Sequence, residues 1–188
     1  TLSIMSACRS TVSAMAEAAL GLGTNLGDRE AALARAVALL EQMPDIEVTA
    51  ISGLYASAPW GVEDQPDFLN LCLLIETDLG PMQLLHACKA VEAALGREAR
   101  ERWGPREMDV DVLLMPGIEL DTETLAIPHP RMAERRFVLE PLAEIAPDWL
   151  LDGESVKSRT AALRQRAADQ VCERDEAATR RFADLRAR

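Results

Sequence analysis

The segment "AEAALGLGTNLGDREAALARAVALLEQMPDIEVTAISGLY", Ala16 to Tyr55, contains the patterns of a strand, a helix and a second strand. It begins with a short apolar run that ends in glycine, which is typical of a strand. Asp28 can cap the segment that follows, whose apolar residues have the i, i+3, i+4, i+7 spacing of an amphipathic helix: Leu33, Ala36, Val37 and Leu40. Pro44 ends this helix, and the β-branched run 46–55 predicts a second strand.

The next part of the chain repeats the same order of strand, helix and strand. The apolar run 68–77 predicts a third strand, Pro81 begins a second helix that ends at Gly96, and the run 108–115 predicts a fourth strand. The order β-α-β-β-α-β predicts an α+β fold of ferredoxin-like type, an antiparallel sheet with flanking helices on one face. The long loops between these elements are expected to form the active site.

The flanks of this core differ in composition from it. Residues 1–15 are rich in Ser and Thr and predict a flexible N-terminal extension, with a leader remnant or translation from Met15 as alternatives. The core domain is expected at 16–152, with Phe137 beginning its last strand. Residues 153–188 are rich in Ala, Arg and Glu, which predicts a charged C-terminal helix or helix pair.

Charge and cysteine content limit the class of protein. The chain has 188 residues and a net charge of −11, which argues against a binder of nucleic acid or of anionic membranes. No apolar run approaches the roughly 18 residues of a membrane span. The four cysteines form no C-x-x-C pair, and Cys72 and Cys88 lie in apolar runs, so we expect buried thiols and a reducing, cytoplasmic location.

Two aspartates, Asp109 and Asp111, alternate with valines in the fourth predicted strand. Residues i and i+2 of a strand share a face at a spacing of roughly 6–7 Å, so both carboxylates point one way while the valines point into the core. Such carboxylates can bind Mg²⁺, which often takes one or two of them together with substrate phosphates. A solvated edge strand is the alternative explanation of this pattern alone.

An arginine-rich loop directly before that strand favours the metal site. Its four arginines fall within ten residues: Arg97, Arg100, Arg102 and Arg106. Guanidinium groups match phosphate oxygens in bidentate geometry, so the loop and strand-bound metal ions would together neutralise a polyphosphate. Neighbouring glutamates leave a solvated loop open as an alternative. The chain contains no Walker A sequence and no G-x-G-x-x-G loop, so a nucleotide would be bound by another architecture.

Four segments of the chain carry a resemblance to a known family. They are "LGTNLGDRE" (22–30), "QPDFLN" (65–70), "RWGPREMDVDVLL" (102–114) and "IPHPRMAERRFVLEPLAEIAPD" (127–148). In this order and spacing they resemble the 6-hydroxymethyl-7,8-dihydropterin pyrophosphokinase family of folate biosynthesis. The resemblance covers about Ala18 to Leu150.

This resemblance implies a reaction and its cofactors. The family transfers the pyrophosphoryl group of ATP to the hydroxymethyl group of the dihydropterin and releases AMP. The implied cofactors are two Mg²⁺ ions, held by Asp109 and Asp111, with ATP as co-substrate. Arg106 and Arg97 would contact the phosphates, and Trp103 would lie on a loop that closes over the site and excludes water.

The resemblance also implies two sets of binding residues. Those expected to bind the pterin are Ser57, Ala58, Trp60, Phe68, Asn70 and Phe137, with the two phenylalanines stacking on the ring. Those expected to bind ATP, besides the loop residues, are Lys89, Glu92, His129 and Arg135. Without the resemblance, a phenylalanine at the start of a strand is more often part of the core, and His129 between two prolines could be a surface turn residue.

Two further hypotheses stay open from the sequence. The chain could be a non-catalytic ferredoxin-like module that binds a small ligand or a partner protein. The C-terminal helix could also mediate self-association.

Overall fold

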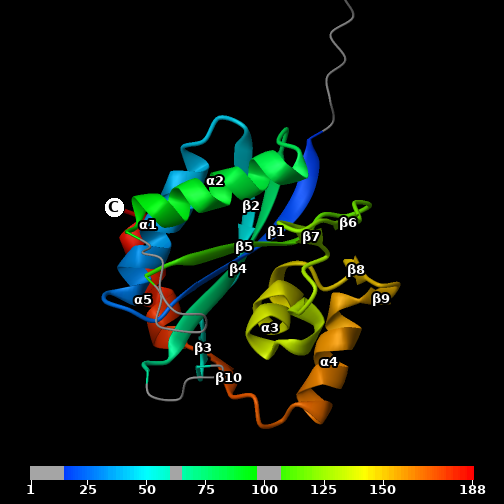
Figure 1. Ribbon diagram of the computed structural model, residues 1–188. Helices are drawn as coiled ribbons and strands as arrows, with labels where there is room; N and C mark the ends of the chain where they lie inside the picture. The colour runs from blue at the N-terminus through cyan, green and yellow to red at the C-terminus, as the bar shows by residue number, and fades with distance from the viewer. Residues whose placement is uncertain (1–14, 60–64, 97–106) are drawn as a thin grey trace, which may run out of the picture.

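The computed structural model describes residues 15–59, 65–96 and 107–188 (Figure 1). Its elements, in chain order, are β1 Ala16–Thr24, α1 Arg29–Glu41, β2 Ile46–Ile51, β3 Tyr55–Ser57, β4 Phe68–Thr77, α2 Pro81–Ala94, β5 Asp109–Leu114, β6 Leu120–Asp121, β7 Ala126–Ile127, the 3-10 helix η1 Met132–Glu134, α3 Arg136–Ile145, β8 Leu150–Leu151, β9 Glu154–Ser155, α4 Val156–Arg166, β10 Cys172–Arg174 and α5 Glu176–Arg186. Among the helices of these ranges, none combines the length and the apolar character that crossing a membrane requires.

The main sheet is antiparallel wherever its described strands pair. Its order is β10-β3-β4-β1-β5, and β2 pairs with the other end of β4. Two small hairpins, β6-β7 and β8-β9, lie outside this sheet. The fold is therefore mixed α+β with an antiparallel sheet, as the sequence predicts.

Helices cover both faces of this sheet. One apolar cluster fills the space between the sheet and α1, α2 and α5, and a second lies between the sheet and α3 and α4 (Figure 1). The expectation of helices on one face is therefore wrong. Its source is the expected strand at Phe137, which lies in α3 instead. Val138, Leu139 and Leu142 are buried there with helical spacing and pack on the second face.

The first two helices confirm the sequence patterns that predict them. In α1 the four predicted apolar residues are all buried, and Asp28 accepts a hydrogen bond from the backbone N–H of Ala31 at 3.1 Å. In α2 Pro81 stands at the first position, and Gly96 follows the helix with a positive φ of 83°. This left-handed conformation favours glycine and ends the helix where the sequence predicts.

The single strand predicted over 46–55 is divided into β2 and β3. Between β2 and β3, the backbone N–H groups of Gly53 and Leu54 bond to side chains and not to a neighbouring strand. The Gly53 N–H donates to the carboxylate of Glu144, and the Leu54 N–H donates to the hydroxyl of Thr179 at 2.9 Å. These partners come from α3 and α5, so contacts distant in sequence override the local β propensity.

The C-terminal residues, for which the sequence predicts a helix or a helix pair, contain the helices α4 and α5. Between these helices lies a strand that the sequence did not predict. That strand, β10, adds to the edge of the main sheet beside β3. Helix α5 buries Ala178 and Phe182 in the same cluster as α1. Residues 153–188 thus contribute to both the sheet and its apolar core.

Candidate active site

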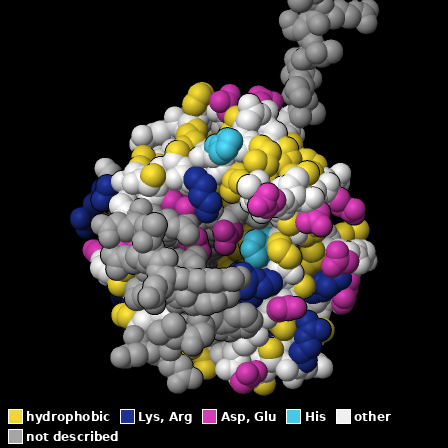
Figure 2. Space-filling model, in the orientation of Figure 1, with side chains coloured by type: hydrophobic (Ala, Val, Ile, Leu, Met, Phe, Trp, Pro, Cys, Tyr) yellow, Lys and Arg dark blue, Asp and Glu magenta, His cyan; other side chains and the backbone are white. Residues whose placement is uncertain are grey.

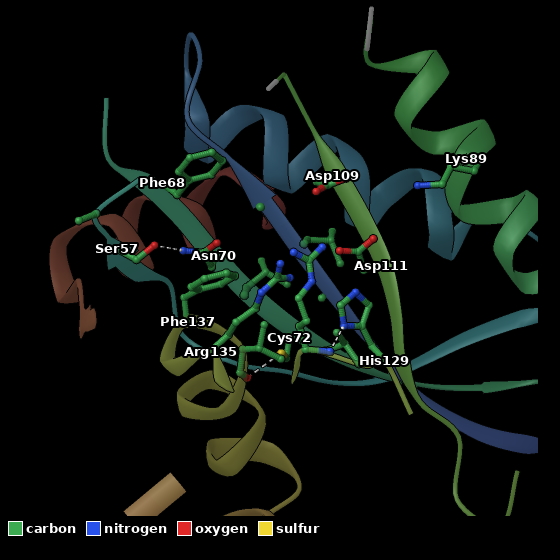
Figure 3. A pocket seen from close by; sticks show the side chains of 18 residues that line it. Ser57, Phe68, Asn70, Cys72, Lys89, Asp109, Asp111, His129, Arg135 and Phe137 are labelled. Atoms are coloured by element: carbon green, nitrogen blue, oxygen red, sulfur yellow. Dashed lines mark hydrogen bonds between the residues drawn. The ribbon is translucent and has the colours of Figure 1, made fainter. Parts of the chain in front are cut away.

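A cavity of about 250 Å³ lies beside β5, on the sheet face that carries α3. Ten predicted site residues line it: Ser57, Ala58, Phe68, Asn70, Lys89, Asp109, Asp111, His129, Arg135 and Phe137. The labelled side chains converge on this space from β3, β4, α2, β5 and α3 and from the segment after β7 (Figure 3). On the molecular surface, charged side chains of both signs and a histidine surround the middle of the corresponding face (Figure 2).

Asp109 and Asp111 share one face of β5, as the alternating sequence predicts. Val110 and Val112 point the other way and are buried in the cluster beneath α1 and α2. Both carboxylates line the cavity. The alternation therefore gives the strand one face packed in the core and one face that lines the cavity.

The surroundings of Asp111 disfavour its charge. Its pKa is raised to about 6, first by burial and then by the neighbouring charge of Asp109, while the positive charges of Lys89 and Arg135 oppose the rise. Among the described residues, no group of three or more His, Cys, Asp or Glu side chains could hold a metal. A Mg²⁺ ion between these two carboxylates fits their chemistry, and would complete its coordination with water or ligand phosphates.

Three groups with nitrogen donors surround the carboxylate pair. Lys89 reaches the cavity from α2, and Arg135 is 8% exposed, with its guanidinium 5.5 Å from the ring centre of Phe137. Burial and the charges of Arg135 and Arg131 lower the pKa of His129. Its Nδ1 accepts a hydrogen bond from the backbone N–H of Arg131 at 3.2 Å, so we infer that the neutral ring carries its proton on Nε2.

Glu92 lies behind the cavity rather than in its wall. Its side chain is 3% exposed, and Oε1 accepts hydrogen bonds from the backbone N–H of Val110 at 2.9 Å and from Lys89 Nζ at 2.8 Å. It therefore fixes β5 and Lys89 to each other. Glu92, which the sequence resemblance implies to lie near the nucleotide, therefore supports the cavity wall from behind.

The other end of the cavity is formed by an amide and two aromatic rings. Asn70 is 6% exposed, and its Nδ2 donates to Ser57 Oγ at 2.9 Å and to the carbonyl oxygen of Tyr55 at 3.2 Å. Phe68 and Phe137 lie on different sides of Asn70 (Figure 3). Both rings are partly buried and line the cavity, so neither is only a core residue.

Two glycines of β1 also belong to the cavity wall, although the sequence patterns did not indicate them. Gly21 and Gly23 line the cavity and stand opposite Asp111 and Asp109 in the sheet. A Cβ on Gly23 would lie 3.0 Å from Asn70 Oδ1, so a side chain there would crowd the floor of the cavity. Glycines at i and i+2 inside a strand are the signal that could have shown them, since glycine in a strand often marks close approach by a ligand.

Two of the segments that carry the family resemblance, 22–30 and 65–70, meet beside the cavity. Asn25 Nδ2 donates to Gln65 Oε1 at 3.1 Å and to the carbonyl oxygen of Pro66 at 3.0 Å. Arg29 donates to the carbonyl oxygen of Asp67 at 2.7 Å. The predicted site residues that lie outside the described ranges are Trp60, Arg97, Trp103 and Arg106.

Comparison with known proteins gives one family. The model of the family described as "7,8-dihydro-6-hydroxymethylpterin-pyrophosphokinase (HPPK)" matches residues 19–147. A Methylorubrum extorquens protein named 2-amino-4-hydroxy-6-hydroxymethyldihydropteridine pyrophosphokinase is 48% identical over 157 residues, which cover 84% of this chain and 99% of that one. A Bacillus subtilis protein of the same name is 50% identical over 145 residues, covering 77% and 87% respectively.

Solved structures show the same fold. The wild-type Plasmodium falciparum HPPK-DHPS, solved with SDX-DHP, matches with a TM-score of 0.61 at 16% identity. The match covers 82% of this chain and 44% of that one, so this chain corresponds to less than half of the Plasmodium protein.

Proposed function

This chain belongs to the 7,8-dihydro-6-hydroxymethylpterin-pyrophosphokinase family, and from that premise we propose that it transfers pyrophosphate from ATP to 6-hydroxymethyl-7,8-dihydropterin in folate biosynthesis. In this reaction the substrate hydroxyl attacks the β-phosphorus, the bond from that phosphorus to the oxygen of AMP breaks, and AMP leaves. The observation that carries the proposal is one cavity with a carboxylate pair at one end and an amide between two aromatic rings at the other.

The carboxylate end suits the triphosphate of ATP. Asp109 and Asp111 would hold two Mg²⁺ ions, which when bound would neutralise the phosphate charge and orient the chain of phosphates. Lys89 and Arg135 add fixed positive charge at the same end, and the Nε2–H of His129 is a donor for a phosphate oxygen. Glu92 would act through Lys89 and β5 rather than by touching ATP.

The amide end suits the pterin ring. Both hydrogen bonds of Asn70 Nδ2 go to β3, so its Oδ1 is left as an acceptor for the amino and ring N–H groups of a pterin. Phe68 and Phe137 would stack on the ring, and Ser57 and Ala58 would close the edge of the pocket.

The remaining predictions concern residues and features that support this reaction. We propose that Arg97, Arg106 and Trp103 close over the triphosphate and that Trp60 completes the pterin pocket. The catalytic unit would be a ferredoxin-like core at 16–152, an assignment supported by the strand order β2-β4-β1-β5. A cytoplasmic location and self-association through the C-terminal helix stay predictions of the sequence, and light scattering of the full chain would test the second.

AMP release is the direct test of the proposal. Wild-type protein with ATP, Mg²⁺ and the dihydropterin should release AMP in equal amount to the pyrophosphorylated pterin, and should release none when EDTA replaces Mg²⁺ or when the pterin is omitted. A non-catalytic binding module would bind the pterin or ATP in titrations without any AMP. That result would overturn the proposal.

A further inference from the structure

The C-terminal segment 172–186, which lies beyond the matched residues 19–147, contacts the strand that carries the pterin end of the cavity. In the β10–β3 ladder Cys172 stands opposite Ser57, and Arg174 stands opposite Tyr55. Strand β3 is only three residues long and lies between β4 and β10. Without β10 it would be a short strand at the sheet edge, which pairing on one side alone holds weakly.

The same segment satisfies the backbone just before β3. Leu54 is fully buried; its N–H donates to Thr179 Oγ1 at 2.9 Å, and its carbonyl oxygen accepts from the Asp175 N–H at 2.8 Å. Buried backbone groups that lose such partners destabilise the local conformation. The path of the chain into β3 therefore depends on α5 and the residue that caps it.

A contact between Glu144 and Arg174 also stabilises the segment that leads into β3. The Glu144 carboxylate accepts from the Gly53 N–H and, at 3.0 Å, from the hydroxyl of Tyr55, and it lies 3.5 Å from Arg174 Nε. Arg174 packs so closely on Gly53 that a Cβ there would lie 2.4 Å from its Nε. Burial and the Glu144 hydrogen bond both raise the pKa of Tyr55, so its hydroxyl keeps the proton that it donates.

Strand β3 in turn sets the orientation of the Asn70 amide. A backbone carbonyl can only accept, so the bond to the Tyr55 oxygen identifies the atom facing β3 as Nδ2. The Ser57 hydroxyl accepts the second Nδ2 proton. With both donors on β3, Oδ1 points toward Gly23 and the cavity floor.

We propose that β10, Arg174 and Thr179 are positioning groups for pterin recognition: they hold β3, and β3 holds the Asn70 oxygen toward the ligand. The inference rests on the proposed function for the identity of that ligand. It assigns a role in substrate selection to a part of the chain outside the family match.

The test is an Arg174→Ala/Thr179→Val double variant of the full chain. We expect its Kd for the dihydropterin to rise about tenfold, as for the loss of one well-oriented hydrogen bond, while the Kd for ATP with Mg²⁺ changes less than about twofold. The matched control is Arg181→Ala, because Arg181 lies on the same helix but pairs with Glu30 of α1. It should leave both dissociation constants unchanged.

A second measurement needs no ligand. In NMR spectra of the empty protein, the side-chain amide signals of Asn70 should shift and exchange faster in the double variant, and should stay unchanged in Arg181→Ala. Unchanged Asn70 signals, or equal losses of pterin and ATP affinity, would overturn the positioning role. A wild-type chain that does not bind the dihydropterin would instead overturn the proposed function, and with it the ligand named here.

Discussion

The two ends of the cavity differ in the polar groups that line them, an amide at the pterin end and a pair of carboxylates at the phosphate end. At the pterin end, Asn70 has both amide protons bonded to β3, which is itself held on both sides. At the phosphate end, burial and mutual repulsion raise the pKa of Asp111 to about 6 beside Asp109. In the proposed function, one end is organised before the pterin arrives, whereas the other would bind the cations that accompany ATP.

This difference suits a site that, as proposed, would bind two unlike substrates on one small sheet. A neutral aromatic ring gains most from fixed hydrogen bonds and flat apolar walls, because ordering them in advance reduces the entropy cost of binding. A magnesium-bound triphosphate gains most from charged groups that bind the cations and offset the charge of the phosphates. At the phosphate end, therefore, function and stability oppose each other: the neighbouring carboxylates that would bind magnesium also lower the stability of the empty protein.

The largest effect is expected when the phosphate end is broken. Asp109→Ala should lower the rate of AMP formation by about 10³-fold or more, because a lost metal carboxylate removes several kcal/mol of transition-state stabilisation. The dihydropterin Kd without ATP should change less than about threefold, since the two ends are organised separately. Quenched-flow or coupled AMP assays and pterin titration measure the two quantities.

The control for this variant is Asp121→Ala, which removes an exposed strand aspartate outside the cavity wall. It should leave AMP formation unchanged. Near-normal turnover of Asp109→Ala would show that the carboxylate pair does not hold the catalytic metal.

Breaking the pterin end should have a smaller and more selective effect. Asn70→Ala should weaken dihydropterin binding by about 10- to 100-fold, because it removes the oriented acceptor and leaves acceptors of β3 without their donor. The Kd for ATP with Mg²⁺ should be unchanged. Isothermal titration with each ligand tests this split.

Thr77→Ala is the matched control on the same strand. Thr77 is also buried and donates to the carbonyl oxygen of Asp45, at the end of β4 distant from Asn70. It should lower the melting temperature without changing either affinity. If Asn70→Ala and Thr77→Ala weakened pterin binding equally, the loss would reflect general destabilisation and not recognition.

The parts of this molecule that the sequence predicted are those that local patterns determine. The alternation at Asp109 to Val112 and the helical stripe of α1 each depend on periodicity within one element. The break at Gly53 and the strand β10 depend instead on partners more than 90 residues away, such as Glu144 and Thr179. Such contacts leave no local signature, so the division of one strand into two was not predicted.

The site residues also divide into those that local sequence patterns place and those that only the structure places. Residues in resembling segments, such as Asn70 and His129, line the cavity as predicted, because each is placed by its own strand or by a short turn. The place of Glu92 could be found only from the structure, since its hydrogen bonds to Val110 and Lys89 show that it supports the cavity wall. Phe137 reaches the expected cavity from a helix instead of the expected strand, because the apolar spacing of that segment is helical.

The smallest expected effect is a change in the free energy of unfolding caused by the buried carboxyl of Asp111. A carboxyl whose folded pKa is raised costs the fold nothing when both states are protonated below its ordinary value of 3.8, and costs progressively more as pH rises toward its folded value of about 6. Asp111→Asn should therefore stabilise the empty protein by about 1–3 kcal/mol at pH 8, less at pH 5. Urea unfolding at the two pH values measures this gain.

Adding magnesium distinguishes two explanations of a stability gain in Asp111→Asn: relief of the electrostatic repulsion, and better packing of the new side chain. At pH 8, Mg²⁺ with a non-hydrolysable ATP analogue should stabilise the wild type, because cations relieve the repulsion between Asp109 and Asp111, and should stabilise Asp111→Asn much less. Asp121→Asn should behave as the wild type does in both experiments. An Asp111→Asn variant with no pH-dependent gain would mean that the phosphate end carries no electrostatic cost, and that both ends of the cavity are equally organised before binding.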